Sequence, residues 1–518
     1  MATITVERPR AVRRRPRTLH VVATCAALVA VLPLIYLVVR ANDLGRAAVL
    51  ETIVQPRTLE LSVRSVGLAA AVAATCIAVG VPLAWLIVRT DVPGGRWWLV
   101  VAALPLAIPS YVTASAWVAA VPGFQGAAAA WLVLSASCLP YVVLPVAGML
   151  GRIDPALEDV ARTLGLRRAA AFRRVVAPLL LPAAASGGLL SALYVLSDFG
   201  AVSLLRFDSF TRVIYTSYRA SFDRTTAAVL SMVLVALALV FVLLERRIRT
   251  RHAQWRVGGG VAREPVRVRL GRLRWAGLAA LVSVYAVSLA FPVVMLAVLT
   301  LRGRRDLDVG EWLGALGSTV QASAVGAVIA MALAIPIGLL AARARDRWSR
   351  AVETTAFLGH ALPGVVVGLS LVYLGLTVAP SLYQTLALLG LAYAVLFLSN
   401  AIGSVRSAAE QVPPVLEDVS RTLGSGAART WLRVTAPLTA PGIAAGALLV
   451  LLTAMKELPA TLMLRPTGMD TLATELWSRT SVGAYAEAAP YAGTLILVAA
   501  VPAFLLARMV GRGDRSSA

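Results

Sequence analysis

Long apolar runs separated by short polar segments fill almost the whole chain. Each run is about 20 to 30 residues long, which is enough for a helix to cross the roughly 30 Å hydrocarbon layer of a membrane. The runs therefore predict about twelve transmembrane helices and an all-α, polytopic membrane protein. They cover residues 19–39, 59–88, 99–120, 127–150, 179–205, 226–244, 275–301, 316–342, 352–378, 385–405, 439–464 and 488–507.

The chain also contains an internal duplication with a fixed offset of 259 residues. Residues 154–178 include Glu-Asp-Val-Ala-Arg-Thr-Leu-Gly, and residues 413–437 include Glu-Asp-Val-Ser-Arg-Thr-Leu-Gly. Each copy follows the fourth apolar run of its half, so each half has six predicted spans. Because six is an even number, the halves are expected to be parallel repeats related by an axis along the membrane normal.

This duplication divides the chain into five parts. We expect a basic leader, a first six-helix half, an Arg-rich linker, a second six-helix half and a short tail. Their residues are 1–18, 19–244, 245–274, 275–507 and 508–518.

Each duplicated segment, called a bracket below, is predicted to form a short helix, a turn and a second helix. In the first bracket, Asp154 is placed to cap the free amides of a helix, and Pro155 suits the first helical position. Gly165 and Gly424 follow the short helices and offer the left-handed conformation that ends a helix. The arginines that follow Gly165 lie opposite the apolar positions, so the outer face of the bracket is charged.

The composition agrees with a membrane protein. Hydrophobic residues make up 59% of the chain, charged residues 14%, and the mean hydropathy is +0.79, whereas soluble proteins average about 25% charged residues. The net charge of +23 would suggest a nucleic-acid partner if it formed one patch. The arginines are instead distributed among short loops, so we expect a lipid bilayer and no nucleic acid as the partner.

The distribution of basic residues predicts the orientation of the chain. Most of the 49 Lys and Arg residues fall in the leader, the two brackets, the linker, the tail and the basic turns near Arg89 and Arg343. By the positive-inside rule this side is the cytoplasm. Both brackets and both termini are therefore expected there.

Ionisable side chains within the predicted spans lie at matched places. Ser197-Asp198 in the fifth span aligns with Lys456-Glu457 in the eleventh at the 259-residue offset. Because charged groups at membrane depth are costly and usually face a cavity or a partner, Asp198, Lys456 and Glu457 are candidates for a substrate path or gate. The alternative is a structural ion pair that holds the two halves together.

Other chemistry is not expected from this chain. Lys456 is the only lysine, and Met455 rather than Gly precedes it, so the chain has no Walker A motif and is not itself an ATPase. The three histidines and three cysteines are not clustered at metal-ligand spacing. We therefore assign no catalytic residue, no metal site and no bound cofactor, and a membrane-embedded enzyme is disfavoured.

The brackets resemble the EAA loop of membrane permeases in ABC importers. Asp159 replaces the leading Glu of that motif, and Ser420 replaces the final Ala in the second copy. The resemblance implies that both brackets dock into cytoplasmic ATPase subunits and transmit the ATP-driven movement to the membrane helices. It assigns this coupling role to Glu158, Asp159, Ala161, Arg162 and Gly165, and to Glu417, Asp418, Ser420, Arg421 and Gly424.

Residues 197–205 and 455–466 are similar to the corresponding segments of fused-half permeases of bacterial ferric iron importers. The resemblance implies a type I ABC importer permease in the bacterial inner membrane that works by alternating access. It also implies two copies of a cytoplasmic ABC ATPase, which bind ATP and Mg, and a periplasmic or lipid-anchored protein that delivers Fe(III).

Importers of thiamine, polyamine, sulfate or phosphonate share the bracket and the general architecture, so these cargoes remain alternatives. An ion-gradient-driven secondary transporter is an alternative of another class. It would leave the duplicated brackets unexplained.

Overall fold

Helices account for almost all of the chain described by the computed structural model, which covers residues 17–95, 97–219, 224–252, 267–303, 308–344 and 346–515. Within these residues, ten helices are long and apolar enough to cross a membrane, or up to eleven if one sharply bent pair is counted as a span. The residues described thus confirm the expected all-α, multi-pass class.

The two halves repeat the same series of elements, except that the second half has one long helix where the first half has two consecutive ones. In the first half the series is α3 (Pro56–Arg89), α4 (Trp97–Ala103), α5 (Ser110–Ala120), α6 (Ala127–Cys138), α7 (Pro140–Leu150), α8 (Pro155–Thr163), α9 (Arg168–Ala171), α10 (Ala177–Ser197), α11 (Gly200–Leu204), α12 (Phe210–Arg219) and α13 (Arg224–His252). In the second half it is α16 (Val309–Arg343), α17 (Arg347–Phe357), α18 (Gly364–Thr377), α19 (Leu386–Gln411), α20 (Pro414–Thr422), α21 (Ala427–Thr430), α22 (Ala436–Ala454), α23 (Pro459–Leu464), α24 (Leu472–Ser481) and α25 (Tyr485–Arg515).

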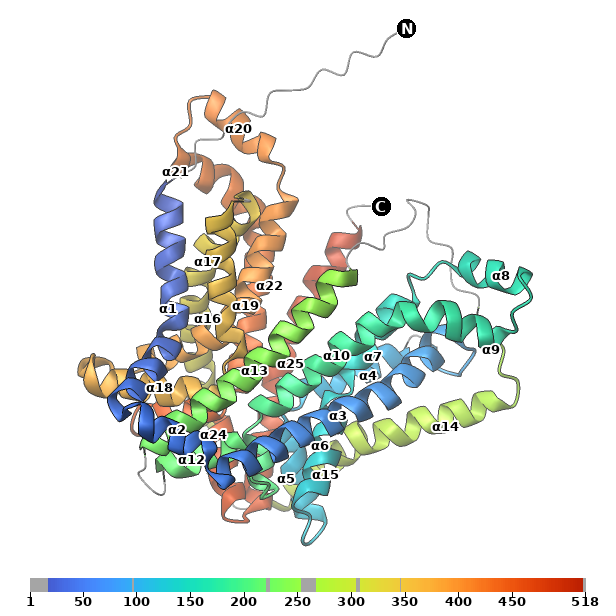
Figure 1. Ribbon diagram of the computed structural model, residues 1–518, viewed down its shortest axis with the longest axis horizontal. Helices are drawn as coiled ribbons and strands as arrows, with labels where there is room; N and C mark the ends of the chain where they lie inside the picture. Colours follow the sequence, from blue (N-terminus) through green and yellow to red (C-terminus); the bar gives the residue numbers. More distant parts are fainter. Residues whose placement is uncertain are drawn as a thin grey trace.

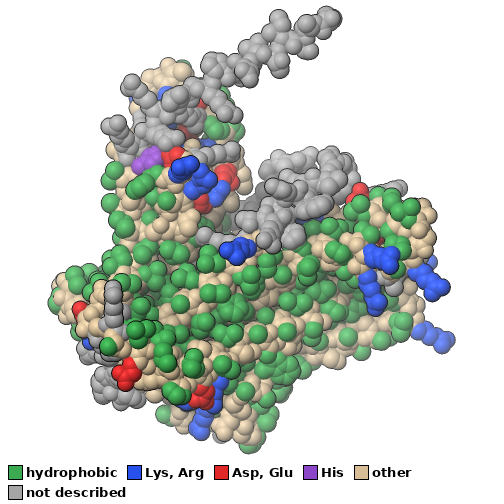
Figure 2. All heavy atoms as spheres, in the orientation of Figure 1, with side chains coloured by type: hydrophobic (Ala, Val, Ile, Leu, Met, Phe, Trp, Pro, Cys, Tyr) green, Lys and Arg blue, Asp and Glu red, His purple; other side chains and the backbone are tan. Residues whose placement is uncertain are grey.

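The halves form two arms that diverge toward the brackets and meet at the opposite end (Figure 1). Where they meet, side chains from both halves share one apolar cluster that includes Tyr111, Phe199, Leu458 and Leu476. Hydrophobic side chains cover the flanks of both arms, and charged side chains gather toward the bracket ends and the opposite end (Figure 2). Such a band suits a bilayer that surrounds the flanks.

The first helix of each half packs beyond its own half. Helix α1 (Arg17–Leu44) contacts α16 and α17, where Ala23, Ala26, Ala27 and Ala30 lie in one cluster with residues of the second half. Helix α14 (Leu273–Tyr285) lies against the first half, and Tyr285 stacks on Trp98. It leads into α15 (Phe291–Gly303), which contacts α5 and α25. The first helix of each half therefore lies against the arm formed by the other half.

Two predicted spans are broken where the sequence suggested continuous helices. The run at 99–120 forms α4, a 3-10 turn η1 (Leu104–Ala107) and α5, with an 86° bend at the break. The run at 352–378 is divided in the same way by a 3-10 turn η5 (Leu358–Ala361) between α17 and α18. Pro109 and Pro363 lie at the two breaks. Proline cannot donate the backbone hydrogen bond that would continue a helix, so each proline favours the interruption.

Two further spans end earlier than predicted. The runs at 179–205 and 439–464 contain the α10 and α22 helices, which end at Ser197 and Ala454, and the chain restarts as the short helices α11 and α23. The acids Asp198 and Glu457 lie in these interruptions. The pattern of apolar residues continues across both breaks, which is why it predicted uninterrupted helices.

The described residues of the linker contact the first half. Helix α13 includes the first residues of the linker and ends at His252. Residues 253–266 lie outside the described residues. After them, Val268 N–H donates to the Arg89 carbonyl at 2.7 Å. Leu270 N–H donates to the Asp91 carboxylate at 2.8 Å. Most of the expected basic leader (residues 1–16) and residues 516–518 of the tail also lie outside the described residues.

Close packing of α10 against α7 gives a test of the fold. A Cβ at Gly187 would clash with the Tyr141 carbonyl oxygen and lie 2.9 Å from Val142 Cα, both of which are backbone atoms that cannot rotate away. We expect Gly187→Ala to cost about 1–3 kcal/mol of stability, measured as a lower thermal unfolding midpoint in detergent micelles. Gly67→Ala is the matched control, because a Cβ there meets nothing within 4 Å. Equal midpoints for the two variants would contradict this packing.

Candidate functional site

The short helix of each bracket begins and ends as its sequence requires. In the first bracket the Asp154 carboxylate accepts a hydrogen bond from Ala156 N–H at 2.9 Å, and Pro155 occupies the first helical position. Gly165 has a φ of 87° and its counterpart Gly424 has a φ of 83°. The predicted left-handed turn is therefore present in both copies, where Leu166 N–H and Ser425 N–H close it on carbonyls five residues earlier.

Each bracket continues into its membrane helix through a wide π turn. These turns are η2 (Phe172–Val176) and η7 (Trp431–Thr435), separated by the same 259-residue offset. Pro178 and Pro437 lie two residues beyond and have no N–H to donate. The preceding Ala177 and Ala436 instead donate to carbonyls five residues earlier. The bracket is thus joined to α10 or α22 without a loop.

The second bracket differs from the first at two matched positions, and the two changes compensate each other. Ala161 and Ala171 are buried in the first copy, at 5% and 1% exposure. The matched residues in the second copy are Ser420 and Thr430, whose hydroxyl oxygens lie 3.1 Å apart and share a hydrogen bond. Two alanines are replaced by two residues whose added hydroxyl groups satisfy each other, so the contact between the two bracket helices is kept.

The glutamates of the two brackets form ion pairs within the chain, and their role in ATPase coupling stays a prediction. Glu158 forms an ion pair with Arg89, and Glu417 pairs with Arg343 at 2.7 Å. These arginines are the last residues of α3 and α16, and Arg343 also donates to the Val412 carbonyl at 3.0 Å. Each ion pair therefore fastens a bracket to a second long helix.

The remaining charged residues assigned to the brackets lie on the surface. Asp159 and Arg162 form an exposed pair at 3.7 Å, and Asp418 and Arg421 form the same pair at 3.6 Å. Because both members of each pair are about half exposed, they contribute little to stability. Their exposure leaves these side chains accessible to another protein.

An exposed apolar stripe on each bracket was missed at the sequence level. Leu157, Val160 and Leu164 are 46%, 57% and 79% exposed, and they follow the i, i+3, i+7 spacing of one helix face. The matched residues Leu416, Val419 and Leu423 are 40%, 49% and 80% exposed. This spacing was readable in the sequence, but only the structure shows that the described residues leave it uncovered.

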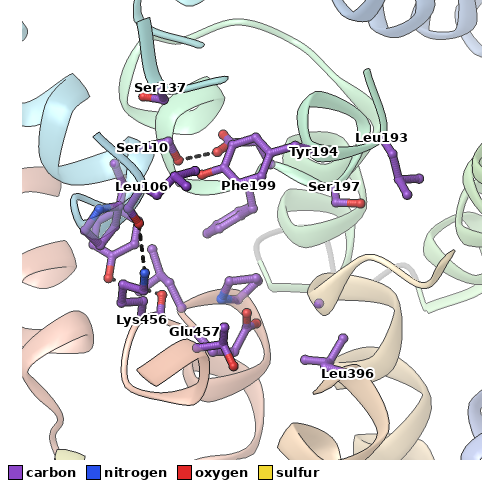
Figure 3. Close-up of a pocket in the computed structure, with 18 of the residues that line it drawn as sticks. Leu106, Ser110, Ser137, Leu193, Tyr194, Ser197, Phe199, Leu396, Lys456 and Glu457 are labelled. Atoms are coloured by element: carbon purple, nitrogen blue, oxygen red, sulfur yellow. Dashed lines mark hydrogen bonds between the residues drawn. The ribbon is translucent and has the colours of Figure 1, made fainter. Parts of the chain in front are cut away.

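A cavity of about 380 Å³ lies between the halves where the arms meet (Figure 3). It is lined by the three residues singled out within the spans, Asp198, Lys456 and Glu457, which come from both halves. Other polar residues lining it are Ser110, Tyr111, Ser137, Tyr141, Tyr194, Ser197, Asn400 and Thr453. The structure therefore brings the candidate path residues together. We call this space the central cavity.

Both acids of the central cavity cap a restarted helix. The Asp198 carboxylate accepts from Ala201 N–H at 3.0 Å and Val202 N–H at 3.2 Å, and its other oxygen accepts from the Ser110 hydroxyl. The Glu457 carboxylate accepts from Ala460 N–H at 3.1 Å. A carboxylate suits this position because the first amides of a helix have no partner within it.

The two acids differ in length, and their surroundings differ to match. Ser110 donates to Asp198, whereas the matched element in the second half begins with Gly364. A Cβ at Gly364 would overlap the Glu457 carboxylate. The extra methylene of glutamate therefore fills the space that the serine side chain takes in the first half. The two matched pairs, Ser110 with Asp198 and Gly364 with Glu457, thus fill similar volumes.

Lys456 joins the halves without pairing with its neighbouring acid. Its Nζ donates to the Leu106 carbonyl at 3.1 Å, across the interface between the second and first halves (Figure 3). Lys456 therefore links the two halves by a hydrogen bond to a backbone carbonyl, and not by the ion pair considered as an alternative. No group of three or more His, Cys, Asp or Glu side chains that could hold a metal ion occurs among the residues described.

Comparison with known proteins identifies the same duplicated architecture. Residues 76–252 and 334–513 match the family described as "Binding-protein-dependent transport system inner membrane component". The chain is 34% identical over 503 residues to "Fe(3+)-transport system permease protein FbpB 2" of Haemophilus influenzae, which covers 95% of this chain and 98% of that relative.

Two further relatives match about half of the chain. The sulfate transport system permease protein CysT of Salmonella typhimurium is 29% identical over 252 residues, covering 45% of this chain and 91% of the relative. The molybdate/tungstate transport system permease protein WtpB of Thermococcus kodakarensis is 26% identical over 251 residues, covering 46% of this chain and 100% of the relative. Proteins of this kind correspond to one half of the present chain.

The two regions that match the family cover most of the chain, and each contains one bracket and one acid of the central cavity. The duplication, the brackets and the multi-pass helical fold all agree with that match. The chain therefore belongs to the inner membrane components of binding-protein-dependent transport systems and carries two fused permease repeats.

Proposed function

We propose that this permease imports ferric iron delivered by an extracytoplasmic binding protein. The proposal rests on the similarity over nearly the whole of both chains to a permease named for Fe(3+) transport. The central cavity supports it, because carboxylate and hydroxyl oxygens from Asp198, Glu457 and the lining tyrosines suit a hard cation. Sulfate and molybdate, named for the half-length relatives, carry negative charge and would meet two acids there.

The brackets are the proposed docking sites for two copies of a cytoplasmic ABC ATPase. Each presents an apolar stripe of three residues flanked by an exposed acid–arginine pair, which is the composition of a protein interface. ATP and Mg would be bound by those subunits and not by this chain. The two matched stripes support one ATPase subunit per bracket, and both termini would lie on this cytoplasmic side.

The described conformation suits the inward-open state of an alternating-access cycle. The arms diverge on the bracket side (Figure 1). The apolar cluster that includes Phe199 and Leu458 closes the opposite end. Closure of the ATPases would bring the brackets together and open that cluster to the loaded binding protein. A secondary transporter driven by an ion gradient would have no use for two matched stripes.

ATP-dependent uptake into proteoliposomes tests the proposed cargo. We expect vesicles holding the permease and its ATPase to accumulate iron when supplied with an Fe(III)-loaded binding protein. Binding proteins loaded with thiamine or sulfate should give no uptake above vesicles without ATP. Uptake of either of these cargoes without iron would overturn the cargo assignment and leave the family assignment intact.

Truncation of the apolar stripe tests the docking site. Burying a leucine side chain stabilises a complex by about 1.5–3 kcal/mol, so Leu164→Ala or Leu423→Ala should weaken ATPase binding by about ten- to a hundredfold. Affinity is measured by surface plasmon resonance on permease in nanodiscs. Leu243→Ala, at an exposed leucine in the lipid-facing part of α13, is the control and should bind normally. Unchanged affinity of both stripe variants would exclude this face.

Replacement of the buried ion pair tests how the bracket is coupled to α16. Removing one partner of a buried pair costs about 3–5 kcal/mol, whereas replacing both by apolar residues is nearly neutral. We therefore expect Arg343→Met and Glu417→Met each to lower iron uptake per ATP hydrolysed, and the double variant to recover much of it. A double variant as impaired as the worse single variant would show that Glu417 acts on the ATPase directly.

A further inference from the structure

A second cavity continues from the central cavity toward the brackets. Its volume is about 410 Å³, and it lies between α10 and α13 of the first half and α17 and α19 of the second. Leu190, Leu193 and Asn400 line both cavities. The two spaces therefore adjoin and form one route from the acids of the central cavity to the side on which the arms diverge. We call the second space the bracket-side cavity.

One carboxylate from each half lines the bracket-side cavity. Glu245 lies near the end of α13, and Ser186 donates to it at 3.3 Å. Glu353 lies on α17, and Arg406 donates to it at 2.5 Å while also donating to Glu410 at 2.9 Å. Because Arg406 is shared between Glu353 and Glu410, its single positive charge does not balance both carboxylates, and these three side chains together keep a net negative charge.

A buried hydroxyl without a partner lies at the same cavity. Ser399 lines it, is 7% exposed, and its Oγ has no hydrogen-bond partner. A buried polar atom left unsatisfied is costly, so this hydroxyl oxygen is available to a ligand in the cavity. The next residue in the sequence, Asn400, lines both cavities.

We propose that Glu245, Glu353 and Ser399 form a transient binding site for a hard, oxygen-preferring cation as it leaves the central cavity for the cytoplasm. The site deepens the proposed iron import and rests on it for the identity of the natural cargo. Two carboxylates and a hydroxyl from opposite halves provide oxygen ligands, and the cation retains water for the remainder of its shell. Movement of one arm separates the two carboxylates and weakens the site.

Weak binding at this place suits transport better than a complete metal site. A route conducts when each site attracts the ion enough for entry and holds it loosely enough for departure. The described residues provide no cluster of three acids, histidines or cysteines along the route. The central and bracket-side cavities then act as successive weak binding sites, and each contains two acids from opposite halves.

Terbium(III) tests the site independently of transport, because it is a hard trivalent cation whose binding can be followed by luminescence. Permease in nanodiscs without ATPase is titrated with the ion at fixed pH. Losing a charge-assisted contact is expected to weaken affinity by about tenfold. We therefore expect Glu245→Gln with Glu353→Gln to remove one bound equivalent or lower its affinity to that extent, and Ser399→Ala to give a smaller decrease.

Glu410→Gln is the matched control for these variants. Glu410 is the other acid bound to Arg406, but it does not line the cavity, so its loss disturbs the same arginine without touching the site. We expect wild-type terbium binding from this variant. Equal loss in Glu410→Gln and Glu353→Gln would assign the effect to Arg406 packing and overturn the site.

Iron uptake separates this proposal from the cargo assignment. If the wild type transports Fe(III), the Glu245→Gln, Glu353→Gln double variant should transport it about tenfold more slowly, with normal amounts of protein and an unchanged size-exclusion profile. Unchanged terbium titration in the double variant would overturn the release site whatever the cargo is. Failure of the wild type to take up iron, with terbium binding lost in the double variant, would overturn the cargo alone.

Discussion

The absence of water from the hydrocarbon layer is the constraint on which this structure depends. A helix that stops inside a membrane leaves amide and carbonyl groups that only the protein can satisfy. The chain stops α10 and α22 at matched points and supplies a carboxylate at each restart, Asp198 for α11 and Glu457 for α23. The same two acids line the central cavity. One pair of side chains therefore both caps the restarted helices and lines the central cavity.

Duplication supplies the architecture, and small asymmetries adapt each copy. Ser420 and Thr430 replace two alanines as a mutually satisfied pair, and a longer acid accompanies Gly364 where a shorter one accompanies Ser110. In both cases a change at one position is balanced at its neighbour, so the shape is preserved. Lys456 is different, since its partner is a carbonyl of the other half. Fused repeats can hold such one-sided contacts, which two identical subunits would have to duplicate.

Sequence patterns predicted the fold class, the duplication and the bracket turns because each depends on local residues. Gly165 sits where a left-handed residue is needed, and long apolar runs can only be membrane helices or a buried core. The breaks before α5 and α11 were missed because apolar residues continue across them, although Pro109 marks one of them. The partners of Glu158 and Glu417 could not be predicted, since Arg89 and Arg343 are about 70 residues away in sequence.

Each bracket is attached to the membrane helices at two places. The π turn continues the bracket into α10 or α22, and the partly buried ion pair fastens it to the end of α3 or α16. Helix α3 packs along α10, and α16 packs along α22. A displacement of the bracket therefore moves two adjoining helices together and does not bend one of them. Since α10 and α22 end at the acids of the central cavity, each arm can carry that displacement to the cavity as a rigid lever.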